Sequence, residues 1–275
     1  MSSAITALLD ASRFEILPLK SSADAVAALP PASEVSVTCS PAHGLHVMQD
    51  LVARLADLGH HAVPHIAARL VQDRDHARRL AGWCRDHAVR EVFVIAGDAL
   101  EPSGPYPGAE PFLRDFLDAG PGVSGVGISG YPDGHPLIAK NTLSDALLAK
   151  QELLESAGVP SMISTQMCFD VERIVSWVRH IRADGVTLPI RLGVPGVVDK
   201  GKLLALGTRV GVGASLRYLR KNRALVGKLA MPGGYDPLTL IRAIIPNAEA
   251  CAIEALHVFT FNAVQPTLER WAAAH

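Results

Sequence analysis

Short stretches of nearly continuous hydrophobicity recur along the chain and alternate with stretches of helical periodicity. A strand that is covered on both faces reads as an apolar run, so each short stretch predicts a buried parallel strand. We predict eight strands in this way: FEILPL (14–19), VSVTCS (35–40), HAVPHI (61–66), EVFVIAG (91–97), GVGISGY (125–131), SMISTQ (161–166), PIRLGV (189–194) and LHVFTFN (256–262).

The stretches between these strands carry apolar residues on one helical face. Residues 46–59 place Leu51, Leu55 and Leu58 together and end at Gly59, a common helix stop. The same scheme covers 75–89, 147–158 and 170–185.

Eight strands alternating with helices predict an α/β fold, a single (β/α)8 TIM barrel that occupies residues 1–275 as one domain. A doubly wound open sheet is the alternative. The glycine fingerprint of a dinucleotide-binding open sheet is absent after the first strand, where the sequence reads PLKSS.

Composition and charge bear on the expected partners and location of the protein. The 275 residues are 49% hydrophobic and 19% charged, with a formal net charge of −1, so no electrostatic reason exists to expect a nucleic-acid or membrane partner. We find neither a signal-peptide pattern nor an apolar run long enough to span a membrane. Four widely separated cysteines without a CxxC pair make disulfides and zinc sites unexpected and favour a cytoplasmic location.

Polar side chains gather where the predicted strands end. In a barrel, functional residues lie at the carboxyl ends of the strands and in the loops that follow. Polar strand ends are also common simply because the chain is emerging into water, so the signal is of moderate strength. The residues at these ends are Glu15, Thr38, His65, Asp98, Tyr131, His135, Gln166 and Asn262.

At this point the sequence resembles a known family. The segments FEILPLKS, VSVTCS, VPHIA, IAGDAL, GYPDGHP, STQMCFD, PIRLGVPG and HVFTFN occur in the order of the signatures of the methylenetetrahydrofolate reductases. Those signatures include a Tyr-Pro-Glu-x-His-Pro turn and a Thr-Gln-Phe-Phe-Phe-Asp strand end. The resemblance covers almost the whole chain. Its most specific matches are Tyr131, Pro132, His135, Pro136, Thr165, Gln166, Phe169 and Asp170.

The resemblance implies a (β/α)8 barrel and a reaction of one-carbon metabolism. In the family, NADH or NADPH reduces FAD, and the flavin reduces 5,10-methylenetetrahydrofolate to 5-methyltetrahydrofolate. The chain is therefore expected to be an oxidoreductase with a tetrahydrofolate substrate.

The resemblance also assigns catalytic and substrate-binding residues. Glu15 matches the acid that protonates the pterin when the methylene bridge opens, and burial can raise the pKa of such a carboxyl toward neutrality. Asp98 matches the carboxylate that stabilises the cationic iminium. Both are expected to bind substrate, together with Gln166, which suits the amide edge of a pterin. Phe169 is expected to face the pterin or to belong to the core.

Further matches are to residues that line the flavin. They are Thr38, His65, Gly97, Asp98, Tyr131 and His135, with Asp145 and Lys150 on the following helix. A metal is not expected, because His60, His61 and His65 have no carboxylate or cysteine at a metal-ligand spacing.

Several departures from the family pattern bear on FAD. Ala96 replaces an arginine, and Leu148, Gln151 and Glu152 stand where polar or basic groups meet the flavin's ribose and phosphates. A diphosphate requires positive charge or helix N-termini. A subset of the family transfers hydride directly from NADH to the folate, so flavin-free transfer is the alternative to FAD. The basic stretch 216–228 is a solvated helix face or a contact for the folate tail or nicotinamide phosphates.

Two other functions remain open at this stage. A non-catalytic folate- or flavin-binding barrel protein would not need the acid Glu15. A phosphate-substrate aldolase would need a lysine at a strand end, and none of the eight predicted ends has one. The sequence leaves open whether the chain forms a homo-oligomer.

Overall fold

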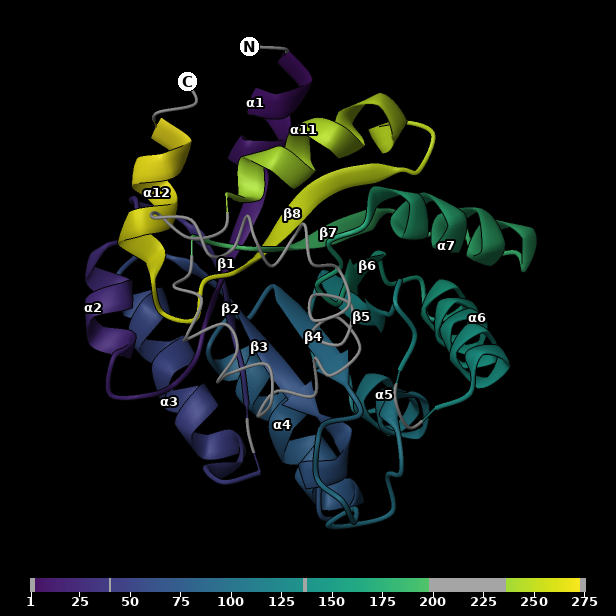
Figure 1. Cartoon of the computed structure of the whole chain (residues 1–275). Coiled ribbons are helices and arrows are strands. Elements are labelled where there is room, and N and C mark those ends of the chain that lie inside the picture. The colour runs from purple at the N-terminus through teal and green to yellow at the C-terminus, as the bar shows by residue number, and fades with distance from the viewer. Residues whose placement is uncertain (1–2, 40, 136–137, 198–235, 273–275) are drawn as a thin grey trace.

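In a computed structural model, which describes residues 3–39, 41–135, 138–197 and 236–272, eight parallel strands close into a barrel in the order β1-β2-β3-β4-β5-β6-β7-β8 (Figure 1). This confirms the predicted (β/α)8 barrel. The strands are β1 (Ser12–Ile16), β2 (Glu34–Val37), β3 (His61–Ala67), β4 (Glu91–Ile95), β5 (Gly125–Gly130), β6 (Ser161–Thr165), β7 (Ile190–Pro195) and β8 (Ile253–Phe259).

Helices lie outside the barrel and cover its strands (Figure 1). They are α1 (Ser3–Asp10), α2 (Ser22–Ala27), α3 (Gly44–Asp57), α4 (Arg74–Asp86), α5 (Ala109–Asp118), α6 (Lys140–Ser156), α7 (Val171–Ala183), α11 (Pro237–Ala248) and α12 (Val264–Ala272), with the 3-10 turn η1 (Ala68–Leu70) after β3. Helices α3, α4, α6 and α7 correspond to the four predicted helices. Among the described residues, no helix has both the length and the apolar character needed to cross a membrane.

The first, second and last strands differ most from their predicted bounds. β2 runs from residue 34 to 37 rather than from 35 to 40. β1 runs from residue 12 to 16 rather than from 14 to 19, and it ends before Pro18, which has no N–H to offer a strand ladder. β8 runs from residue 253 to 259 rather than from 256 to 262. It ends before Phe261 and Asn262, whose φ angles of 50° and 63° are incompatible with a strand.

Side chains alternate between the barrel interior and the helix layer. In β1, Phe14 packs outward against Trp271 of α12, with ring centroids 5.4 Å apart. Arg13 instead reaches Glu91 of β4, a strand that does not neighbour β1, so it crosses the interior. The outward positions form the hydrophobic core beneath the helices, and the inward positions of β1 are polar.

A charged layer fills the interior at the amino ends of the strands. Arg13 is 2% exposed and donates to both carboxylate oxygens of Glu91 at 2.6 Å, and to Glu34 at 3.1 Å. Arg191 of β7 adjoins them and donates to the carbonyl oxygen of Ala11 at 3.1 Å. Arg13 thus has the charged partners that a buried ion requires, whereas Arg191 is held by a backbone carbonyl oxygen.

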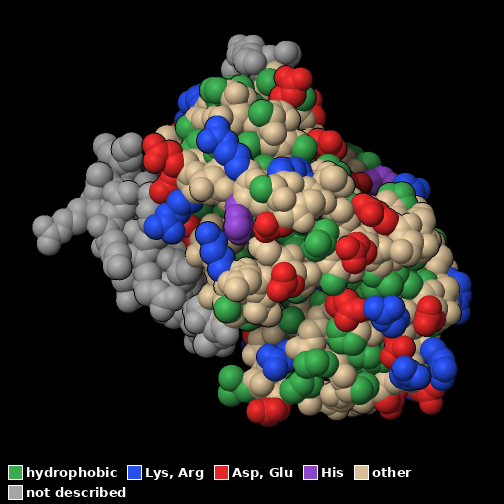
Figure 2. All heavy atoms as spheres, turned by 90° about the vertical axis from the view of Figure 1, so that its right-hand side faces the viewer, with side chains coloured by type: hydrophobic (Ala, Val, Ile, Leu, Met, Phe, Trp, Pro, Cys, Tyr) green, Lys and Arg blue, Asp and Glu red, His purple; other side chains and the backbone are tan. Residues whose placement is uncertain are grey.

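The outer surface carries charges of both signs. Figure 2 views the molecule from the side of α5, α6 and α7, and acidic and basic side chains are interspersed over that face. This face therefore presents no extended single-sign field of the kind that attracts nucleic acid.

Candidate active site

Glu15 lies in the interior of the barrel, one layer above Arg13. Its strand, β1, pairs with β2 and β8, and the side chain is only 5% exposed. Burial raises the pKa of Glu15 to about 7, an effect that the nearby His65 opposes. Near neutral pH a large fraction of this carboxyl is therefore protonated, as a general acid requires.

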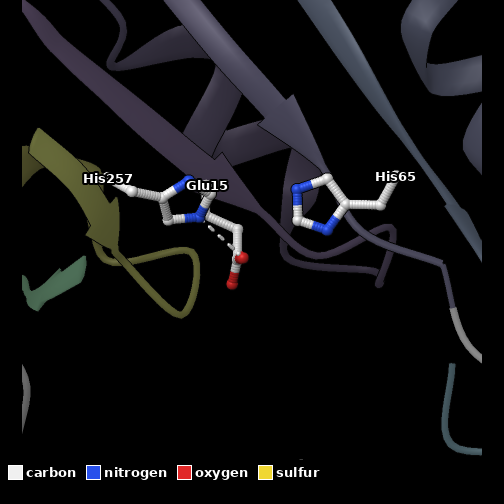
Figure 3. A group of neighbouring side chains, drawn as sticks. All are labelled: Glu15, His65 and His257. Atoms are coloured by element: carbon white, nitrogen blue, oxygen red, sulfur yellow. Dashed lines mark hydrogen bonds and ion pairs between the residues drawn. The ribbon is translucent and has the colours of Figure 1, made fainter. Parts of the chain in front are cut away.

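His257 of β8 is hydrogen-bonded to Glu15, with Nε2 3.0 Å from Oε2 (Figure 3). The imidazole is 1% exposed, and burial, reinforced by Arg13 and Arg191, lowers its pKa to about 3. His257 is thus a neutral ring beside the acid.

His65 of β3 lies on the other side of the same group (Figure 3). It is 4% exposed, packs edge-on against Phe93 with ring centroids 4.6 Å apart, and lies 5.8 Å from the ring of His257. Burial lowers its pKa to about 3, so it too is neutral. Its Nε2 is buried and has no hydrogen-bond partner among the described residues.

One carboxylate and two neutral imidazoles are also the components of a metal site. One ligand-type atom from each of Glu15, His65 and His257 lies within 4.8 Å of the other two. The sequence analysis weighed His60, His61 and His65 as a possible metal site. In the structure, His65 instead lies beside Glu15 and His257. Metal binding at this group would require Glu15 to release the proton that burial favours.

Asp98 lies in the loop after β4, where a glycine shapes the backbone. Gly97 has φ of +91°, and a Cβ there would lie 2.7 Å from the Cβ of Ala67. The Asp98 side chain is exposed, yet partial desolvation in this loop raises its pKa while His135 lowers it. Asp98 also raises the pKa values of Tyr131 and Cys39, so these groups share one region at the carboxyl end of the barrel.

Tyr131 and His135 form an aromatic pair in the turn after β5. Their ring centroids are 5.4 Å apart and the rings meet edge to face. Burial raises the pKa of Tyr131, and a hydrogen bond with Ser129 opposes the rise. The turn thus brings Tyr131 and His135 close to Asp98. The resemblance implies the same proximity, because it assigns all three residues to one pocket.

Gln166 follows β6 and is held by the backbone on both sides. Its N–H donates to the carbonyl of Gly130 at 2.8 Å, and its side-chain Oε1 accepts from the N–H of Met167 at 2.9 Å. With Oε1 engaged, the amide NH2 is the group left for a ligand. Phe169, three residues later, is half-buried and packs against the hydrophobic core.

Two other strand-end residues connect β1 to its neighbours. The half-buried Thr38 donates its N–H to the carbonyl of Ile16 at 3.1 Å. Asn262 accepts from the N–H of Leu17 at 2.8 Å and donates to the carbonyl of Leu17 and to Ser21. Asn262 therefore joins the loop after β8 to the loop after β1.

The two α6 residues matched to the flavin site do not lie together. Asp145 is exposed, whereas Lys150 is 7% exposed, and burial lowers the pKa of Lys150 to about 8. Five residues apart on a helix, they point about 140° away from each other. The basic stretch 216–228 lies outside the described residues.

The part of the barrel that the structure describes includes two sizeable hollows. One of about 690 Å³ lies between the turn after β5 and the start of α7, and Asp133, Lys140, Arg173 and Trp177 contribute to its lining. The other, of about 470 Å³, lies at the amino ends of the strands beside Glu91 and Arg191, at the opposite end of the barrel from Asp98 and Tyr131.

His257 and Phe93 are site residues that sequence reasoning missed. The signal was present, because a period of two along the last strand places His257 on the same face as Phe259. Those two rings lie 4.7 Å apart in the structure. His257 lies two positions before the end of β8, inside the strand rather than at its end.

Comparison with known proteins agrees with the resemblance. Residues 33–200, more than half of the chain, match the family model described as methylenetetrahydrofolate reductase. Methylenetetrahydrofolate reductase 2 of Saccharomyces cerevisiae is 27% identical over 154 residues, which are 50% of this chain and 22% of the yeast protein. The chain therefore matches only about a fifth of that relative's length.

Among solved structures, an uncharacterized Clostridium thermocellum protein that binds two copies of 5-methyl-5,6,7,8-tetrahydrofolic acid shares the fold. The TM-score is 0.56 and the identity 13%, over 97% of this chain and 98% of that one. On the strength of the match over residues 33–200, the chain belongs to the methylenetetrahydrofolate reductase family.

Proposed function

We propose that this protein is an NADH- or NADPH-dependent oxidoreductase that reduces 5,10-methylenetetrahydrofolate to 5-methyltetrahydrofolate within a single barrel domain. The observation that carries the proposal is the buried Glu15, whose pKa is raised to about 7 beside two neutral imidazoles. Perturbed pKa values of this kind cluster at catalytic sites, and a carboxyl that is still protonated near neutral pH can act as a general acid.

The proton balance of the reaction explains the need for this acid. Opening the methylene bridge breaks a C–N bond and leaves an iminium, and the departing nitrogen must gain a proton. Glu15 supplies that proton and becomes a carboxylate, which solvent protonates again after each turnover. A hydride then reduces the iminium to a methyl group.

Asp98 and Gln166 have complementary roles in the proposal. Asp98 places a carboxylate at the carboxyl end of the barrel, where a negative charge stabilises the cationic iminium. Gln166, with Oε1 held by the N–H of Met167, donates from its amide to an acceptor on the pterin edge. Phe169 packs on the core, so we assign it a supporting role.

The described residues suit a planar ring better than a diphosphate. Tyr131 and His135 offer aromatic surface, and Gly97 allows a close approach. The α6 residues are less suitable for a diphosphate, because Asp145 is acidic and the ammonium of Lys150 is buried with a lowered pKa. FAD, which would relay hydride from the nicotinamide, and direct transfer from the nicotinamide therefore both remain proposals.

The decisive experiment is oxidation of NADH by the purified protein, with and without methylenetetrahydrofolate and with and without FAD. We expect oxidation that depends on the folate, and its loss in Glu15→Gln. The visible spectrum reports whether FAD is bound. Folate binding in a calorimeter without any NADH or NADPH oxidation would instead identify a non-catalytic binding protein.

A further inference from the structure

The hydrogen bond between His257 and Glu15 joins two almost fully buried side chains on adjacent strands. Register between β1 and β8 pairs Glu15 with Phe259 and Arg13 with His257. His257 therefore lies diagonally from Glu15, and its Nε2 reaches Oε2 at 3.0 Å. The other carboxyl oxygen, Oε1, takes no part in this bond.

The surroundings of His257 indicate which of its nitrogens carries the proton. Nδ1 is buried and has no hydrogen-bond partner in the described part of the chain. A proton on Nδ1 would leave a buried N–H donor without an acceptor, which is a costly arrangement. The tautomer with its proton on Nε2 avoids that cost and makes His257 the donor to Glu15.

The groups around the pair keep His257 uncharged. β3 contributes the neutral His65 and β4 the apolar Phe93, while the layer beneath contains Arg13, Arg191 and Glu91. Burial and the two arginines disfavour an imidazolium, and Glu91 only partly opposes them. A neutral donor orients the carboxyl without adding the positive charge that would make Glu15 ionise too easily.

We propose that His257 is a positioning residue for Glu15, whose Oε2 it engages through Nε2–H so that the acidic proton resides on Oε1. This inference rests on the proposed function. In the reaction, the O–H bond at Oε1 breaks and an N–H bond forms on the departing nitrogen of the substrate. The Nε2–H of His257 then stabilises the carboxylate that remains, and a proton from water restores the acid.

The test compares three substitutions of His257 that differ in their ability to donate at this position. Glutamine reaches the place of Nε2 with an N–H, asparagine is too short to do so, and leucine has no donor. The pKa of Glu15 is measured by carbon-13 NMR on protein labelled at glutamate, with Glu15→Gln used to assign the signal. This readout does not depend on turnover.

We expect His257→Leu and His257→Asn to raise the pKa of Glu15, because its carboxylate loses a hydrogen bond, and His257→Gln to keep it near the wild-type value. Loss of one such bond corresponds to a decrease in kcat of roughly tenfold, with KM within about twofold. The basic limb of the pH profile should move upward with the pKa of Glu15. In a Glu15→Gln background, His257→Leu should change kcat less than about twofold, because residues that act through one another are not additive.

An unchanged pKa of Glu15 in His257→Leu, or an equal loss of kcat with and without Glu15, would overturn the proposal and leave His257 a packing residue. If His257→Leu fails to fold, the comparison of glutamine with asparagine decides the same question. The two proposals can fail separately. If the wild-type protein does not reduce methylenetetrahydrofolate, but His257→Leu still raises the pKa of Glu15, the proposed function is refuted and the positioning role of His257 is retained.

Discussion

Replacing Glu15 with glutamine removes the proton that the proposed reaction requires and keeps the size of the side chain. Loss of a general acid typically lowers the rate by about 10²–10⁴-fold. We expect Glu15→Gln to lose NADH oxidation to this extent while its dissociation constant for the folate stays within a few-fold. Turnover above half of the wild-type rate would exclude Glu15 from the mechanism.

The same substitution makes a prediction about stability. The pKa of Glu15 rises from 4.5 to about 7 on folding, so the folded state holds the proton more tightly than the unfolded state does. Stability from this group is present below the unfolded pKa and is lost as the pH rises through about 7. The free energy of unfolding of Glu15→Gln should therefore exceed that of the wild type by about 3 kcal/mol near pH 8, and should differ little from it near pH 4. Urea titrations at the two pH values measure the difference, and a constant difference would contradict the raised pKa.

The loop after β4 depends on a glycine that positions Asp98. Gly97→Ala forces a Cβ to within 2.7 Å of Ala67 at φ of +91°, so we expect a loss of about 1–3 kcal/mol in unfolding free energy and a lower kcat. Gly82→Ala is the matched control. Gly82 lies inside α4 with room for a methyl group, and alanine there should stabilise the helix by about 0.5–1 kcal/mol. Equal effects at the two positions would show that the loop geometry is not constrained.

The turn after β5 carries the aromatic pair Tyr131 and His135. If the pair forms one wall of a ring-binding pocket, replacing both with alanine should raise KM for NADH or the dissociation constant for FAD. Steady-state kinetics and a flavin titration separate the two cofactors. If neither constant changes, the pair is only part of a turn.

Closure of the barrel forces charges from distant parts of the sequence to pair in its interior. Arg13→Met would remove the main partner of Glu91, and we expect a loss of about 2–3 kcal/mol. This is below the cost of about 3–5 kcal/mol for a fully buried pair, because Glu91 is partly exposed and Arg191 still lies nearby. Arg78→Met, which breaks the exposed pair between Arg78 and Asp75, should cost less than about 1 kcal/mol. Chemical denaturation of the two variants tests the contrast, and comparable losses would refute it.

Much of the architecture follows from local patterning. All eight strands were predicted because parallel strands covered on both faces are apolar runs, and α3, α4, α6 and α7 because their apolar periodicity is regular. The helices α1, α2, α5, α11 and α12 were missed. Of these, α2 is six residues long, and α11 has Pro246 inside it, which obscures the pattern.

Local patterning also placed the polar residues that follow the strands. Asp98, Tyr131 and His135 were expected from strand ends and from the resemblance, and they share one region because the carboxyl ends of parallel strands meet at one end of a barrel. Their individual roles remain predictions.

The sequence alone was enough to predict the eight-stranded barrel, the family resemblance and Glu15 as a candidate acid, because each depends on residue types read in order along the chain. Only the tertiary structure decided that His257 hydrogen-bonds Glu15, that His65 faces both, and that Arg13 pairs with Glu91. These residues lie on β1, β3, β4 and β8, which are far apart in the sequence. Closure of the barrel brings them together. Burial, which sets the protonation states of Glu15 and the two histidines, likewise arises only when the chain folds around them.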